Sequence, residues 1–132
     1  MTDEKKLLSL AKAARENAYA PYSHFRVGAA LLTADGKVYT GANIENSSFG
    51  LTVCAERNAL FKAVENGERS FVAIAVVGGK DLLEKRCYPC GACRQVLKEF
   101  CKDDFKIVLG DEEDVEIKTL GQLLPFSFEL EK

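Results

Sequence analysis

The sequence predicts an α/β protein, a three-layer α-β-α sandwich in which helices cover both faces of a mixed five-stranded sheet. Helical and strand-like segments alternate along the chain in the order α-β-β-α-β-α-β-β-α. Asp35-Gly36 separates the first two strand-like segments, and residues 110–114 separate the last two. Parallel neighbours need a crossover of a dozen or more residues, so links this short predict that the first and last strand pairs are antiparallel.

The first part of the chain predicts one helix, a hairpin and a polar loop. Apolar residues at helical spacing predict a helix over residues 3–18. The dense apolar run over residues 25–33 is typical of a strand buried on both faces. Asp35-Gly36 then indicates a hairpin leading to a strand over residues 38–42. Residues 43–52 are rich in Asn, Ser and Gly, so we expect an exposed functional loop there.

The second part of the chain continues the alternation of helices and strands. Residues 54–65 predict a helix that Asn66-Gly67 ends, and residues 91–101 predict another helix. Residues 71–77 predict a second strand that is buried on both faces. The remaining segments are a polar connection over residues 78–89, strands over 106–109 and 115–118, and a short helix opened by a capping box at 119–122.

Length and composition predict a single domain over residues 1–132 and exclude some classes of protein. The net charge is −2 and the lysines are scattered among acids, which argues against nonspecific binding of nucleic acid. No apolar signal segment follows the first residues, and the longest apolar run, residues 71–77, is too short to span a bilayer. Five cysteines in such a chain favour metal binding or catalysis over disulfides. We therefore expect a cytoplasmic protein without membrane contact.

Two cysteine clusters carry the chemistry of this chain, Cys54-Ala55-Glu56 and Pro89-Cys90-Gly91-Ala92-Cys93. Both fall at the starts of predicted helices, where free N–H groups and the helix dipole favour thiolates. Three thiolates can bind one zinc ion and leave its fourth position open for water. The sequence therefore predicts a catalytic zinc site with Cys54, Cys90 and Cys93 as its ligands.

Two charged residues complete the predicted zinc site. Glu56 can take a proton from the metal-bound water and deliver it to a leaving group, although a glutamate in a first helical turn can also merely stabilise the helix. Three thiolates and Zn²⁺ carry a net charge of −1, so the site needs a compensating cation. Arg57 or Arg94 can supply it by donating hydrogen bonds to sulfur. We hypothesise that Arg57 does so, because it adjoins the first cluster.

The other candidate ligands do not fit a metal site. Cys87 and Cys101 match no ligand spacing, and we expect a core thiol at Cys101 and a packing or surface role for Cys87. His24 is the single histidine and lies thirty residues before Cys54, so we expect it to form structural hydrogen bonds.

At these residues the chain resembles the small zinc-dependent cytidine deaminases of the short-chain homotetrameric type. The resemblance covers nearly the whole chain, because five segments match the family in order. These segments lie at residues 19–31, 41–46, 54–57, 89–95 and 123–128.

The resemblance implies a reaction and its machinery. The reaction is hydrolytic deamination of cytidine, and of 2′-deoxycytidine, to uridine or deoxyuridine and ammonia, as in pyrimidine salvage. It implies one Zn²⁺ per subunit, attack of zinc-bound hydroxide at C4, and Glu56 as the general acid and base. Arg57 would neutralise thiolate charge, and Ala55 would offer backbone groups to the edge of the pyrimidine.

The resemblance also implies how the nucleoside is held. Asn43 and Glu45 would bind the ribose 3′-hydroxyl, although an Asx turn and a surface acid also fit these residues. Phe25 would pack on the pyrimidine face, and Phe128 would reach into a neighbouring subunit of a homotetramer with shared sites. The chain departs from the family at Phe49, where a tyrosine is common. Phe49 can keep the packing of the aromatic ring but cannot make a contact through a hydroxyl.

Three other functions compete with this interpretation. Nucleic-acid editing deaminases share the zinc chemistry but commonly use His as the first ligand, where this chain has Cys54. Deaminases of aminonucleoside antibiotics, such as the blasticidin type, share the zinc motifs, but residues 43–46 favour a plain ribose. A zinc-stabilised binding module would have no use for Glu56 beside an open metal position.

Overall fold

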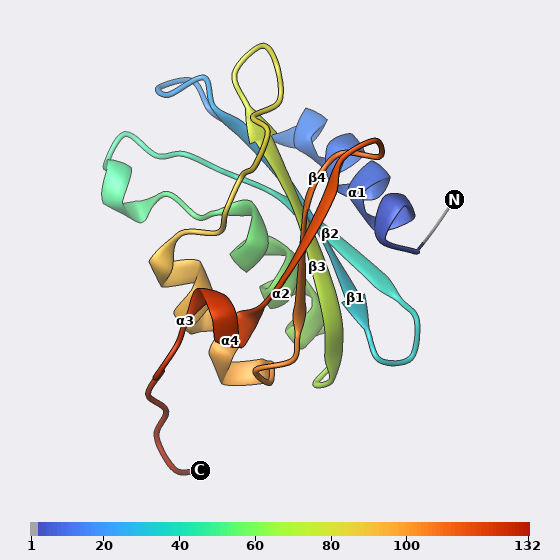
Figure 1. Cartoon of the computed structure of the whole chain (residues 1–132). Coiled ribbons are helices and arrows are strands. Elements are labelled where there is room, and N and C mark those ends of the chain that lie inside the picture. The colour runs from blue at the N-terminus through green and yellow to red at the C-terminus, as the bar shows by residue number, and fades with distance from the viewer. Residues whose placement is uncertain (1–2) are drawn as a thin grey trace.

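A computed structural model describes residues 3–132 and shows a mixed five-stranded sheet (Figure 1). The strand order is β2-β1-β3-β4-β5. The β3–β4 pair is parallel, and the β1–β2, β1–β3 and β4–β5 pairs are antiparallel. The predicted antiparallel pairing of the first two and last two strands is therefore confirmed. The strands are β1 (Arg26–Thr33), β2 (Val38–Ala42), β3 (Phe71–Gly79), β4 (Lys106–Gly110) and β5 (Val115–Thr119).

Helices cover both faces of this sheet, as the sequence predicts (Figure 1). One face carries α1 (Asp3–Ala14), which continues as the 3₁₀ turn η1 (Arg15–Asn17). The opposite face carries α2 (Ala55–Glu65), α3 (Gly91–Phe100) and the short α4 (Leu120–Leu123). A second 3₁₀ turn, η2 (Phe49–Leu51), lies in the loop before α2. Within residues 3–132, no helix combines the length and the apolar character that crossing a membrane requires.

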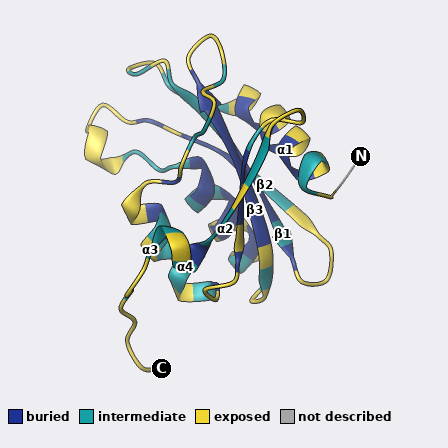
Figure 2. Ribbon diagram, in the orientation of Figure 1, coloured by how far each residue is buried: buried dark blue, intermediate teal, exposed yellow. Residues whose placement is uncertain are grey.

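The core consists of two layers that share the sheet. Ala29 and Leu31 of β1 point to the α2 and α3 side, and Ala30 between them points to the α1 side. All three residues are fully buried, because successive strand residues face opposite sides and both sides are covered. Figure 2 shows this burial as a continuous dark band along the central strands. The dense apolar run of β1 reflects this double coverage.

The first helix ends earlier than predicted. The α-helical part stops at Ala14, and residues 15–17 form a 3₁₀ turn, whereas the sequence predicts a helix to residue 18. Arg15 is buried, and its guanidinium donates hydrogen bonds to the carbonyl oxygens of Arg26, Gly79 and Lys80. This tertiary contact outweighs the helical periodicity of the local sequence.

The starts of α2, α3 and β1 all lie at the same edge of the sheet. The chain passes from α2 directly into β3 and from α3 into β4, so α2 and α3 both begin near the carboxyl ends of the parallel pair β3–β4. Arg26, which opens β1, pairs with Gly79 at the end of β3. Ligands of α/β sheets bind at this kind of edge, and the predicted site residues lie there.

Candidate metal centre

The three predicted ligands stand at the starts of two neighbouring helices. Cys54 is the N-cap of α2 and Cys90 is the N-cap of α3, while Cys93 lies in the first turn of α3. The Cys90 sulfur accepts a hydrogen bond from the backbone N–H of Cys93 at 3.5 Å. Cys54 and Cys90 are 36 residues apart in sequence. Their sulfurs are nevertheless in contact, because α2 and α3 pack side by side.

The sulfur positions fit a tetrahedral metal site. The Cys54–Cys90 and Cys90–Cys93 sulfur distances are 3.9 Å and 3.4 Å, and all three sulfurs lie within 4.8 Å of one another. Zinc–sulfur bonds of about 2.3 Å at tetrahedral angles place sulfurs about 3.8 Å apart. Within residues 3–132, no fourth His, Cys, Asp or Glu joins this cluster. The donor set therefore fits zinc with one coordination position left to a non-protein ligand.

Arg57 lies beside the first ligand. Its Nη2 atom donates a hydrogen bond to the Cys54 sulfur at 3.3 Å. The pKa of Cys54 is lowered to about 5, first by a hydrogen bond from the Cys93 thiol and then by the Arg57 guanidinium. The same thiol–thiol bond raises the pKa of Cys93. Metal binding requires thiolates, so a bound cation would displace the thiol protons of this cluster.

Glu56 is a buried acid at the edge of the cysteine cluster. It lies in the first turn of α2, and only 4% of the residue is exposed. Burial raises the pKa of its carboxyl to about 7, and the charge of Cys54 adds to this effect. A carboxyl group whose pKa lies near neutrality can both accept and release protons under physiological conditions. The surroundings of Glu56 therefore suit proton transfer better than simple stabilisation of the helix.

Arg94 does not contact the sulfurs by any hydrogen bond of the described residues. Its Nε donates to the carbonyl oxygen of Pro89 at 2.7 Å, and its Nη1 donates to that of Leu123 at 2.8 Å. Of the two arginines that can compensate thiolate charge, Arg57 is thus the one that bonds to a ligand. The hydrogen bonds of Arg94 within the described residues go to main-chain carbonyls, which favours Arg57 over Arg94 as the compensating cation.

Two buried polar residues, Asn43 and Glu45, follow β2 at the same edge of the sheet. The Asn43 amide accepts a hydrogen bond from the N–H of Val27 and donates one to the carbonyl of Phe25, both at 2.8 Å. An amide has one further N–H and one further lone pair. The Asn43 side chain therefore fixes the start of β1 and keeps capacity for a ligand. An Asx turn at this residue is not what the structure shows.

Glu45 is held as a carboxylate by the loop before β1. Its carboxyl accepts hydrogen bonds from the N–H groups of Tyr22 and Ser23 at 3.0 and 3.2 Å, and from the Ser23 hydroxyl at 2.5 Å. The Ser23 hydroxyl is the main cause that lowers the pKa of Glu45. Glu45 is 5% exposed and is therefore not a surface acid.

The two aromatic candidates differ in how close they lie to the cysteine cluster. The Phe25 ring lies against Gly78 at the end of β3, where a Cβ atom would come within 3.0 Å of the ring and within 2.8 Å of the Cys87 sulfur. Phe128 lies in the C-terminal segment and is 67% exposed. Within one subunit the fold thus brings Phe25 to the site edge and leaves Phe128 uncovered.

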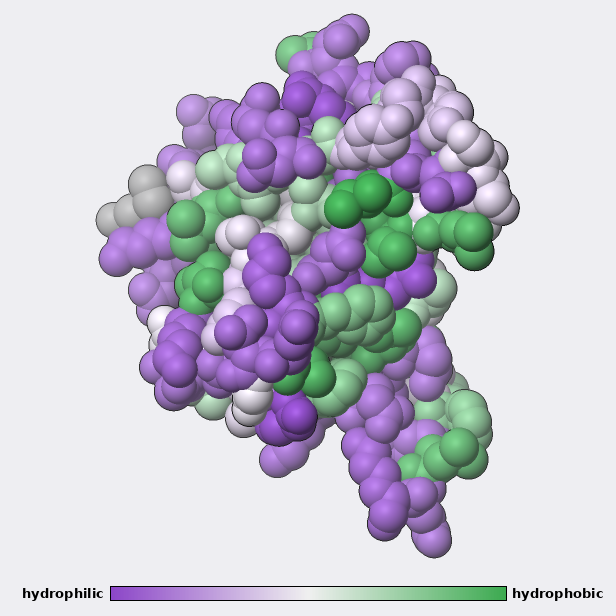
Figure 3. Space-filling model, turned by 180° about the vertical axis from the view of Figure 1, so that it is seen from behind, coloured by the Kyte–Doolittle hydropathy of each residue, from purple (hydrophilic) through white to green (hydrophobic). Residues whose placement is uncertain are grey.

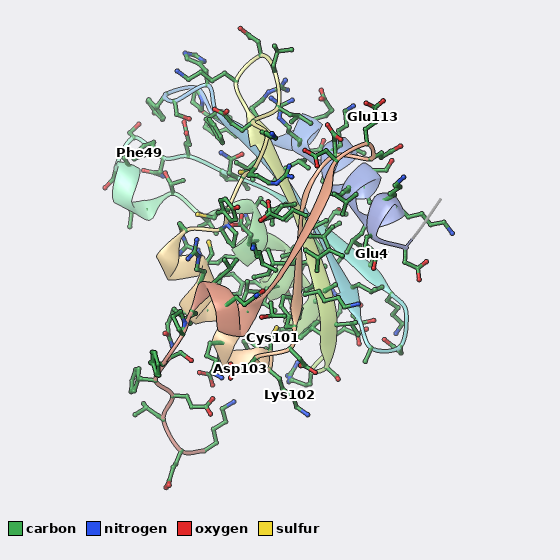
Figure 4. All side chains as sticks on the ribbon, in the orientation of Figure 1. Glu4, Phe49, Cys101, Lys102, Asp103 and Glu113 are labelled. Carbon is green, nitrogen blue, oxygen red and sulfur yellow. The ribbon has the colours of Figure 1, made fainter. Side chains whose placement is uncertain are left out.

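The remaining cysteines and the histidine have no part in the cluster. Cys101 is a buried core residue at the far end of α3 from Cys90 (Figure 4). Cys87 packs against the core, and burial raises the pKa of both thiols to about 12. Within the described residues the His24 imidazole forms no hydrogen bond, whereas the backbone N–H of His24 donates to the carbonyl oxygen of Ala20 at 3.0 Å. The His24 backbone takes the left-handed conformation at φ 60°, directly before Phe25.

Some residues of the site edge are missed by sequence reasoning. Ser23 holds Glu45, and the Asn58 amide of α2 donates to the carbonyl oxygen of Ala42 at 2.8 Å. The Thr52 hydroxyl and the Arg57 Nε are buried without a hydrogen-bond partner in the described structure. Arg57 is singled out by its place beside Cys54, but nothing in the local pattern identifies Ser23, Asn58 or Thr52, since each acts on a segment that is distant in sequence or lies at a loop end.

A sandwich fold that presents three cysteines and a buried glutamate at two helix starts defines the class of zinc-dependent deaminases. Residues 1–109 match the family model described as the cytidine and deoxycytidylate deaminase zinc-binding region. The chain belongs to this family.

Relatives of the chain extend over nearly its whole length. A cytidine deaminase from Halalkalibacterium halodurans is 53% identical over 130 residues, which cover 98% of this chain and 96% of the relative. The solved structure of cytidine deaminase from Burkholderia pseudomallei has a TM-score of 0.88 at 53% identity and covers 97% of this chain and 100% of that one. The cytidine deaminase structure from Mycobacterium tuberculosis has a TM-score of 0.83 at 39% identity, over 98% of this chain and 100% of that one.

Proposed function

We propose that this protein hydrolyses cytidine, and also 2′-deoxycytidine, to uridine or deoxyuridine and ammonia, as a step of pyrimidine salvage. The observation that carries the proposal is the convergence of Cys54, Cys90 and Cys93 within 4.8 Å beside the buried Glu56. Full-length similarity to proteins named cytidine deaminase supports the substrate.

The chemistry divides between the metal and the protein. Cys54, Cys90 and Cys93 would hold zinc, which supplies a Lewis acid that makes water nucleophilic near neutral pH. Glu56 accepts the proton that this water loses when the oxygen bonds to C4 of the pyrimidine. It delivers this proton to N3, then takes the second proton from the hydroxyl oxygen now bonded to C4 and passes it to the amino group, which leaves as ammonia while the C4 carbonyl forms. Its buried position and a pKa of about 7 support both directions of transfer.

The residues around the cluster support binding of a nucleoside. Asn43 and Glu45 are both buried at the site edge and can hydrogen-bond the ribose 3′-hydroxyl. Phe25 would pack on the pyrimidine, and the main chain at Ala55 would meet the edge of the ring. Ser23 keeps the Glu45 carboxyl ionised and oriented, so the sugar finds a preorganised acceptor.

We also propose that the protein works as a homotetramer whose subunits share their sites. The support is a set of exposed apolar residues around η2 and in the C-terminal segment, where Phe126 is fully exposed. Figure 3 shows apolar residues on the rear face and on the projecting tail. Figure 4 shows Phe49 on the outer side of η2. Phe128 of one subunit would then close the nucleoside site of another. We further propose a cytoplasmic location, since all five cysteines are free thiols.

The decisive experiment compares the native protein with Glu56→Gln. The zinc-loaded native protein should convert cytidine with equimolar release of ammonia, and Glu56→Gln should bind zinc equally but lower kcat by about 10²–10⁴-fold. Metal content is measured by atomic absorption and turnover by the loss of cytidine absorbance. Blasticidin S and a cytosine-containing single-stranded oligonucleotide serve as alternative substrates. Faster turnover of either, or full activity of Glu56→Gln, would contradict the proposal.

A further inference from the structure

Arg94 connects two parts of the molecule that are far apart in sequence. It follows the ligand Cys93 in α3, and its two hydrogen bonds end on the carbonyl oxygens of Pro89 and Leu123. Pro89 directly precedes the ligand Cys90. Leu123 is the last residue of α4, from which the C-terminal segment, residues 124–132, departs. One guanidinium thus joins the metal-binding turn to the root of this segment.

The chemistry of the two acceptors explains why an arginine suits this position. The Leu123 carbonyl lies at the C-terminal end of α4, where carbonyl groups have no partner within the helix. The Pro89 carbonyl lies just before the N-cap of α3, outside the helical ladder. The planar guanidinium presents N–H groups in fixed, divergent directions, which a lysine ammonium does not. Arg94 therefore satisfies both carbonyls at once and fixes their separation.

The C-terminal segment makes further contacts with the same helix. The Gln95 amide donates to the carbonyl of Phe128 at 3.2 Å, and the Lys132 ammonium contacts the carbonyl and the carboxylate of Glu99 at 3.0 and 3.1 Å. The segment is otherwise largely exposed (Figure 2). The start of α3 carries two of the proposed metal ligands, Cys90 and Cys93. Other residues of α3 contact the C-terminal segment. The metal ligands and the segment therefore both depend on the placement of one helix.

We propose that Arg94 is a positioning residue that couples metal binding to the ordering of the C-terminal segment. Zinc fixes Cys90 and with it Pro89; Arg94 then transmits this restraint to Leu123 and the segment beyond. The coupling is reciprocal in binding free energy, so a well-placed segment also tightens zinc binding. The inference rests on the proposed function in that zinc is taken as the metal and Phe128 as a substrate contact.

The test uses Arg94→Met, which keeps much of the side-chain volume and removes both donors. Gln95→Ala is the matched control, because the neighbouring residue contacts the segment but not the metal-binding turn. The first readout is the rate at which zinc passes to a chromogenic chelator. The second is amide hydrogen exchange in residues 120–132, compared between zinc-loaded and metal-free protein. Samples are compared at the same oligomeric state.

In the native protein, zinc should slow exchange across residues 120–132. Arg94→Met should weaken zinc binding about 10–100-fold, as for other residues that orient metal ligands, and should release zinc correspondingly faster. It should also lose the zinc-dependent difference in exchange. Gln95→Ala should raise exchange in both forms and keep the difference. Native rates of zinc release in Arg94→Met, or a preserved exchange difference, would overturn the proposal.

Arg94→Lys separates the two hydrogen bonds from the charge and stands in for Arg94→Met if the latter fails to fold. A single ammonium cannot bridge both carbonyls, so this variant should also release zinc faster and lose the exchange difference. Native behaviour of Arg94→Lys would mean that Arg94 acts through its charge alone, which overturns the coupling. Neither readout needs turnover, so cytidine hydrolysis by the native protein tests the proposed function separately.

Discussion

Glu56 and Arg57 are neighbours in sequence, but one is an acid and the other a base, and they affect the cysteine cluster in different ways. Burial raises the pKa of Glu56 to about 7, which favours a proton on its carboxyl near neutrality. Arg57 instead donates to the Cys54 sulfur and helps to lower the pKa of that thiol. One helical turn thus presents a carboxyl group with a pKa near neutrality and a guanidinium bonded to a cysteine sulfur side by side.

Replacing Arg57 by Gln should weaken zinc binding. Without the guanidinium, the pKa of Cys54 rises toward its ordinary value, so proton competition with the metal increases. We expect a loss of zinc affinity of about 10–100-fold, measured by chelator competition at pH 7, with a smaller loss at pH 9. Arg69→Gln is the control, since Arg69 is exposed and, within residues 3–132, bonds only to the carbonyls of Val64 and Glu68. Equal zinc affinity of the two variants would contradict the role of Arg57.

Glycines set how closely the helices approach the sheet. A Cβ atom on Gly41 of β2 would lie 2.5 Å from the carbonyl oxygen of Ala55 and from the N–H nitrogen of Ala59. On the other face, a Cβ atom on Gly28 of β1 would lie 2.0 Å from the carbonyl oxygen of Ala11. The close packing of α2 on β2 places the first turn of α2, and hence Cys54, at the sheet edge.

Gly41→Ala should therefore destabilise the fold and disturb the metal site together. The clash is with backbone, which cannot move aside without shifting α2. We expect a loss of about 1–3 kcal/mol of unfolding free energy in urea, accompanied by weaker zinc binding. Gly50→Ala is the matched control, because a Cβ atom there meets no atom of the described part of the chain within 4 Å. Equal stability of both variants would contradict this prediction, because it would mean that α2 can move away from the sheet without cost.

The whole molecule has a well-filled core but several apolar side chains that one subunit leaves in solvent. Phe105, Leu60 and Ile107 are almost fully buried, whereas Phe126 and Phe128 lie exposed in the C-terminal segment. Exposed apolar surface of this kind marks contact sites for other molecules. It suits the proposed assembly, in which one subunit completes the nucleoside site of another.

Activity should accordingly depend on protein concentration. Dilution below the dissociation constant of the assembly should lower the activity per subunit, because Phe128 then leaves the neighbouring site. Light scattering after gel filtration should follow the same transition, and an inert carrier protein controls for adsorption. Phe128→Ala should raise KM for cytidine severalfold while zinc content stays native. A monomer with constant activity per subunit would contradict shared sites.

Local patterns predict most of the fold because its elements are long and strongly periodic. The Asp35-Gly36 hairpin, the helix over residues 54–65 and the capping box of α4, formed by Thr119 and Gln122, all occur as predicted. The strand over residues 71–77 extends to Gly79, because the last residues of β3 pair with the start of β1. The strand order of the sheet does not follow from local patterns, because it depends on which distant segments pair.

The site residues likewise fall into those that the sequence identifies and those that only the structure reveals. The order Cys-Ala-Glu and Cys-x-x-Cys at predicted helix starts suffices to select the three sulfurs and Glu56. It does not indicate that Arg94 bonds to main-chain carbonyls, or that Ser23 holds Glu45. These contacts join residues 29 and 22 positions apart in sequence, and only a formed sheet with packed helices brings such residues within hydrogen-bond distance.

The amino-acid order alone determines the periodicities that make each helix and strand and the donor types that favour zinc, because both are properties of short segments. The packed chain decides the rest. It sets the sulfur distances, the burial that raises the pKa of Glu56 and the attachment of the C-terminal segment to α3. These quantities depend on distance and solvent exclusion in three dimensions, which no short segment contains.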